Sequence, residues 1–135
     1  MNAAGHHPNA ITAGTVVGAP RRWLRLEAAA LLTAAATAYT TTHRPWWLIP
    51  LTLLLPDLSA LGYLQRPRLG ARLYNLAHAT PLPAILLAVA WTQHKQFLGA
   101  LGLIWLMHIA IDRLLGFGLK YPDEFQHTHL SQPTR

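Results

Sequence analysis

The sequence predicts an all-α integral membrane protein, a four-transmembrane-helix antiparallel bundle with both termini on the cytoplasmic side. Three observations lead to this prediction. Hydrophobic residues make up 52% of the 135-residue chain and charged residues only 12%, whereas about 25% charged residues is usual in soluble domains. Four apolar segments follow one another, each near the length of about 20 residues that crosses a hydrocarbon core. The links between them are short, which makes neighbouring helices antiparallel.

The first two segments cover residues 23–42 and 46–64. Many alanines in the first segment predict close packing against other helices. A cleaved signal peptide is the alternative there, but Glu27 inside the apolar stretch argues against cleavage. In the second segment Pro56 has no N–H to donate, so it frees the carbonyl of Thr52 and predicts a kink just before Asp57.

The third segment covers residues 71–92 and the fourth residues 97–120. Residues 1–20 are rich in Gly, Ala, Pro, Asn and His, which predicts a disordered N-terminal tail. The predicted membrane domain therefore spans residues 21–120. Pro122 ends the last helix, and residues 121–135 are expected to form a solvated cytoplasmic tail. If this tail folds back over the cytoplasmic mouth of the bundle, His129 could join the polar residues there.

The positions of Lys and Arg predict the orientation of the bundle. One side holds the basic residues of 21–25 and 66–72, with Lys120 and Arg135, and the other holds only Arg44 and Lys95. The basic side should be cytoplasmic. This placement accounts for the net charge of +6, so the predicted partner is the lipid bilayer of a cell membrane, which the chain crosses several times, and not nucleic acid.

Two further features of the composition bear on partners and chemistry. The absence of cysteine excludes disulfides, thiol catalysis and cysteine metal sites. Small residues allow helices to approach closely, so a homo-oligomer could form through the last helix, although packing within one chain explains them equally well. The glycines concerned are Gly99, Gly102, Gly116 and Gly118.

Ionisable side chains lie inside the apolar segments, where they are costly and usually face the bundle interior. A helical rise of about 1.5 Å per residue places Asp57, His78 and Asp112 roughly 10 Å deep, in one layer of the cytoplasmic half. His108 is deeper, but it precedes Asp112 by four residues and shares its helix face. Asn75 and His78 share a face in the same way. Glu27 lies in the layer, and Arg113 lies close to it.

The charges of this cluster need compensation, because it holds three carboxylates and one fixed cation nearby. Protons or a bound cation must make up the difference in a low dielectric. The cluster could be a structural hydrogen-bond network, a site for a divalent metal such as zinc or manganese, or a proton or ion pathway. Haem bound through His78 and His108 would leave the carboxylates unexplained. The candidate metal ligands are Asp57, His78, His108 and Asp112, with Glu27 as a candidate catalytic base.

Several stretches resemble a family of small bacterial integral membrane proteins known as domain of unknown function 4260. They read LRLE at 24–27, LPDLSALGYL at 55–64, YNLAH at 74–78 and WLMHIAIDRLLGFGLKYP at 105–122, followed by THL at 128–130. The resemblance implies a four-helix protein of unknown activity in the bacterial inner membrane. It also implies motif positions at Glu27, Asp57, Asn75, His78, His108, Asp112, Arg113 and His129.

A weaker similarity connects the chain to membrane-bound metal-dependent hydrolases, which also carry a Leu-Pro-Asp turn and helical histidines. Leu55-Pro56-Asp57 and the spacing of His108 and Asp112 match, but the histidine-rich motif expected between them is missing. We therefore predict a membrane protein whose cluster is structural or binds protons or a cation. The alternative is a membrane-embedded metal hydrolase acting near the cytoplasmic leaflet.

Overall fold

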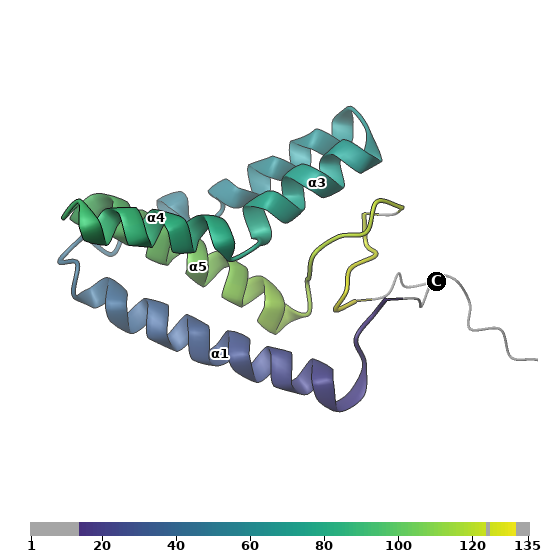
Figure 1. The fold of residues 1–135 in the computed structure, drawn as a ribbon, viewed down its shortest axis with the longest axis horizontal. Coiled ribbons are helices and arrows are strands. Elements are labelled where there is room, and N and C mark those ends of the chain that lie inside the picture. The colour runs from purple at the N-terminus through teal and green to yellow at the C-terminus, as the bar shows by residue number, and fades with distance from the viewer. Residues whose placement is uncertain (1–13, 124, 132–135) are drawn as a thin grey trace, which may run out of the picture.

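A computed structural model describes residues 14–123 and 125–131 of the chain, so most of the predicted N-terminal tail lies outside the described residues. Its regular elements are helices (Figure 1). In order they are α1 (Gly18–Thr40), α2 (Leu48–Thr52), the 3-10 helix η2 (Leu55–Leu64), α3 (Pro67–His78), α4 (Pro81–Thr92) and α5 (Gln96–Leu115). The described part contains no strand, only one isolated bridge between Lys120 and Thr128. The predicted all-α class is confirmed.

Helix α5 is the centre of the fold. It packs against α1, α4 and α2, while α3 packs against η2. Figure 1 shows α1 and α4 running alongside α5, and α3 rising away from α4 at an angle. The main apolar cluster joins α1, α2 and α5, with Ala35 and Ala100 allowing the two long helices to approach closely. Gly102 lies against Leu87 of α4, so this glycine serves packing within the chain, and the homo-oligomer stays a prediction.

Both central predicted helices are interrupted. The chain breaks between α2 and η2, as the position of Pro56 predicted, and Asp57 stands in the first turn of η2. The segment predicted as one helix over residues 71–92 forms two helices, α3 and α4, which meet at an extended residue, Ala79. The cause is Pro81, which cannot donate to the carbonyl four residues earlier and begins a new helix at its N1 position.

The carbonyl that Pro81 leaves without a helical partner belongs to Ala77. The indole Nε1 of Trp105 in α5 donates to this oxygen at 2.6 Å. A buried carbonyl without a donor is costly, so this contact stabilises the break that positions His78. Trp105 therefore contributes a hydrogen bond between α5 and the break as well as packing.

Trp105→Phe should reduce the free energy of unfolding by about 1–3 kcal/mol, because it keeps an aromatic side chain but leaves the Ala77 carbonyl unsatisfied. Unfolding of the detergent-purified protein would measure the loss. Trp91→Phe is the matched control, since Trp91 is 84% exposed. Equal losses for the two variants would contradict this role of the indole N–H.

The last helix ends five residues earlier than the predicted residue 120. Gly116 has φ +95°, and Gly116 N and Phe117 N donate to the carbonyls of Arg113 and Asp112. This pattern is the Schellman motif. It favours glycine at position 116 because the residue there adopts a left-handed backbone conformation. The described residues beyond it, up to residue 131, do not form the predicted solvated tail. His127, Thr128 and Leu130 are buried, so this part of the chain folds back onto the helices.

Two helical stretches are long and apolar enough to cross a membrane: Pro67–Thr92, which contains the break at Ala79, and Gln96–Leu115. A shorter apolar stretch covers Leu48–Leu64. The structure therefore supports two candidate spans by length and composition.

Candidate metal centre

Four predicted ligands come together from three elements. Asp57 lies in the first turn of η2, His78 is the last residue of α3, and His108 and Asp112 lie one turn apart on α5. One ligand atom from each residue lies within 4.8 Å of the other three. The two chain breaks make this possible, because each presents a residue at a helix end toward the central helix.

The separations between ligand atoms are short. The His78 and His108 Nε2 atoms lie 3.0 Å apart. Asp57 Oδ1 lies 3.3 Å from His78 Nε2 and 3.5 Å from His108 Nε2. Asp112 Oδ2 lies 3.5 Å and 3.6 Å from the same two nitrogens. Each imidazole therefore faces both carboxylates and the other imidazole.

Tyr74 orients two members of the cluster. The His78 Nδ1 lies 2.9 Å from the Tyr74 carbonyl, which can only accept, so Nδ1 carries the proton. When the ring is neutral, its Nε2 therefore presents a lone pair to the cluster. The Tyr74 ring also stacks on the His78 ring with centroids 3.7 Å apart, and its hydroxyl donates to Asp112 Oδ2 at 3.2 Å. Such outer contacts are typical of histidines that bind metals.

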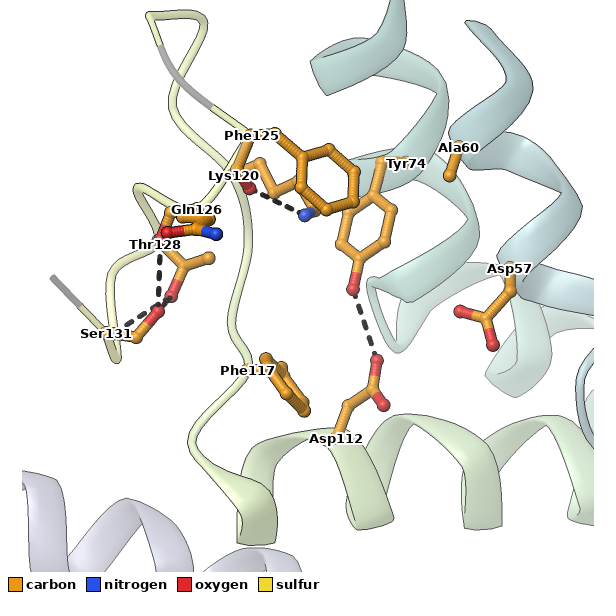
Figure 2. A pocket seen from close by; sticks show the side chains of 10 residues that line it. All are labelled: Asp57, Ala60, Tyr74, Asp112, Phe117, Lys120, Phe125, Gln126, Thr128 and Ser131. Atoms are coloured by element: carbon orange, nitrogen blue, oxygen red, sulfur yellow. Dashed lines mark hydrogen bonds between the residues drawn. The ribbon is translucent and has the colours of Figure 1, made fainter. Parts of the chain in front are cut away.

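The cluster is buried on one side and open on the other. Both histidines are buried, whereas the side chains of Asp112 and Asp57 are 19% and 48% exposed. The carboxylates face a cavity of about 630 Å³. In Figure 2, Asp57 and Asp112 point toward one another on one side of this cavity, with Tyr74 beside them. A ligand in the cavity could therefore reach the carboxylates.

Lys120, on the folded-back segment, forms another part of the cavity wall. Its Nζ lies 3.2 Å from the centroid of the Phe125 ring and 4.4 Å from that of Tyr74, and it donates to the Phe125 carbonyl at 2.7 Å. Burial lowers the pKa of Lys120 to about 8, while Asp112 and Asp57 act in the opposite direction. The ammonium is therefore charged at neutral pH.

Asn75 holds this segment in place and does not join the cluster. Its side-chain nitrogen donates to the Lys120 carbonyl at 2.8 Å, and its oxygen accepts from the Lys120 N–H at 2.6 Å. One side chain thus satisfies both backbone groups of a residue 45 positions away. The contact connects α3 directly to the cavity wall.

The match to a known family covers most of the chain. The family described as Domain of unknown function (DUF4260) matches residues 21–132. The chain belongs to this family. No curated protein and no solved structure matches it. The two carboxylates, two histidines and Asn75 of the site all lie inside the region that the DUF4260 family covers.

The remaining predicted residues of this DUF4260 protein lie elsewhere. Glu27, Arg113 and His129 line a separate cavity of about 400 Å³ beside α1. His129 Nδ1 accepts from the Leu119 N–H at 2.8 Å, and burial, together with the charge of Arg113, lowers the pKa of His129. Glu27 is not among the four clustered residues, and its role as a catalytic base stays a prediction.

Two functional residues were missed at the level of sequence. Tyr74 precedes His78 by four residues, so the shared helix face could have indicated their contact. Lys120 had no such signal, because only the folded-back segment brings it to the cavity.

Proposed function

We propose that this DUF4260 protein is a multi-pass membrane protein that binds one divalent metal ion, with zinc as the preferred ion. The observation that carries the proposal is the spacing of the four ligand atoms. Zinc bonds of about 2.0–2.2 Å in a tetrahedron separate neighbouring ligand atoms by about 3.3–3.6 Å. The four nitrogen–oxygen separations between these atoms are 3.3, 3.5, 3.5 and 3.6 Å. The 3.0 Å contact between the two Nε2 atoms needs only a small widening.

Charge favours the same proposal. Two carboxylates and two neutral imidazoles carry a charge of −2, which one divalent cation compensates. Protons on the imidazoles compensate less, because two Nε2–H groups cannot face each other across 3.0 Å. Two imidazoles and two carboxylates also form a donor set that suits zinc.

Membrane insertion is supported by the exposed apolar surface. Only 22% of the apolar window in Pro67–Thr92 and 39% of that in Gln96–Leu115 is buried, whereas the core helix of a soluble protein is mostly buried. Large apolar side chains are exposed over several helices, with Trp91 at 84% and Leu64 at 83%. Lipid is the solvent in which such surfaces are stable. We propose four spans with the basic side, including Lys120, facing the cytoplasm.

Metal analysis of the protein purified in detergent tests the proposal. After loading with zinc and removal of the excess, we expect about one ion per chain, as in a single four-ligand site. Cobalt in place of zinc should produce the visible absorption of tetrahedral Co²⁺, since the four nitrogen–oxygen separations are those of a tetrahedral site. A protein that retains no metal, or cobalt with a purely octahedral spectrum, would contradict the proposed site.

A second candidate function is metal-dependent hydrolysis, and the exposure of Asp57 favours it. Catalytic zinc sites keep one position for water, and Asp57 is the ligand that faces the cavity most openly. Zinc-loaded protein should then hydrolyse p-nitrophenyl phosphate or p-nitrophenyl acetate, and the metal-free protein should not. Equal rates with and without zinc would exclude this function for those two substrates.

A further inference from the structure

The cavity of about 630 Å³ has cationic and anionic ends. Asp57 and Asp112 stand at one end, and Lys120 contributes the only cationic side chain among its described lining residues. Figure 2 shows Tyr74 lying between the two ends. With a divalent ion bound, the carboxylate end becomes a centre of positive charge open to the cavity. The cavity then presents two positive groups to one shared, partly open space.

The ammonium of Lys120 has capacity left for a ligand. It carries three N–H donors, and in the described part of the chain its one hydrogen bond is to the Phe125 carbonyl. Aromatic rings hold it in position, so the charge is placed without an ion pair to a carboxylate. A buried ammonium of this kind is better compensated by an anion than left alone.

The remaining wall supports a polar head with an apolar surround. Gln126 lines the cavity, and its side-chain amide has no hydrogen-bond partner among the residues that the structure describes. Phe117 and Phe125 flank the cavity and are about half exposed. An anion with several acceptor oxygens could therefore bind the metal, Lys120 and Gln126 together.

We propose that this cavity binds a phosphate group, with one oxygen as an added fifth ligand of the metal ion and another on the Lys120 ammonium. The inference rests on the proposed metal site and names the ligand class of that site. Phosphate fits because its oxygens can bridge two cationic groups and still accept from an amide. The phosphate could belong to a free anion or to the head group of a lipid, and these two sources share the same chemistry.

The test is calorimetric titration of inorganic phosphate into zinc-loaded protein in dodecyl maltoside. Lys120→Met should weaken binding by at least about 10-fold, because a charge-assisted hydrogen bond is lost. Lys120→Arg should restore most of the affinity. Lys95→Met is the matched control, since Lys95 is exposed and outside the cavity, and it should bind phosphate as the wild type does.

Three results would overturn the inference. One is unchanged phosphate affinity in Lys120→Met with normal zinc content, and another is zinc-loaded wild type that binds no phosphate; both leave the metal site standing. A wild type without zinc would overturn the metal site and this inference together. If Lys120→Met does not fold, removal of zinc from the wild type replaces it, since phosphate binding must then weaken.

Displacement of phosphate by short-chain phosphatidic acid, but not by phosphatidylcholine, identifies a lipid head group as the source, and no displacement identifies the free anion. Either pattern supports the phosphate site.

Discussion

His108→Ala should lower zinc affinity by at least about 100-fold, because loss of an outer-shell partner alone costs about 10–100-fold and this change removes a ligand. His108 Nε2 faces His78 Nε2 and both carboxylates, so the change removes one of the four proposed ligands. Zinc content and competition with a chromogenic chelator would measure the effect. The variant should lose most of its metal during purification.

The matched control for this change is His94→Asn. His94 is an exposed histidine in a turn at φ +52°, a backbone conformation that asparagine tolerates. It should keep the metal content and affinity of the wild type. If His108→Ala retained a full equivalent of tightly bound zinc while His94→Asn lost it, the metal would lie elsewhere in the chain and the centre described above would be wrong.

Asn75→Ala should release the folded-back segment from α3. The change leaves the Lys120 N–H and carbonyl without their partner, and each unsatisfied buried group costs about 1–3 kcal/mol. Local opening relieves this cost by exposing both groups to water. Trypsin should then cut after Lys120, which is buried in the wild type, at least about 10-fold faster, since an opening free energy lowered by about 1.4 kcal/mol changes the open population tenfold.

The rate of cleavage after Lys120 can be followed by mass spectrometry beside cleavage after Arg72, within α3. Only the first rate should rise, because α3 keeps its packing against η2. Gln96→Ala removes an exposed amide side chain and serves as the control. An unchanged rate after Lys120 in Asn75→Ala would show that the aromatic contacts of the lysine hold the segment without Asn75.

Local sequence signals predicted the helices but not their continuity. The break before Asp57 was foreseen from Pro56, because a proline removes a donor wherever it stands. Pro81 carries the same signal inside residues 71–92, yet whether a proline bends or divides a helix depends on what satisfies the freed carbonyl. Here Trp105 supplies that donor from another helix, and no local pattern shows such a contact.

The clustering of the four ligand residues has a cause that straight helices do not explain, and the common depth predicted from the sequence stays a prediction. That prediction placed Asp57, His78 and Asp112 in one layer and His108 deeper. In the structure His108 contacts the other three. This is possible because the two neighbouring helical segments are interrupted next to the cluster, one between α2 and η2 and the other between α3 and α4. The four-residue spacing of His108 and Asp112 was sufficient to predict that these two residues lie together. The interruptions of the other two helical segments decided that Asp57 and His78 join them.

The sequence by itself determined the all-α class, the apolar segments and the residues available for a metal, since helical periodicity, hydropathy and side-chain chemistry are local properties. Only the tertiary structure decided which of those residues meet. It separated Glu27 and Arg113 from the four ligands. It also brought Lys120 to the cavity, where two hydrogen bonds from Asn75 to the Lys120 backbone hold the segment. Those outcomes depend on contacts between residues tens of positions apart, which no short pattern encodes.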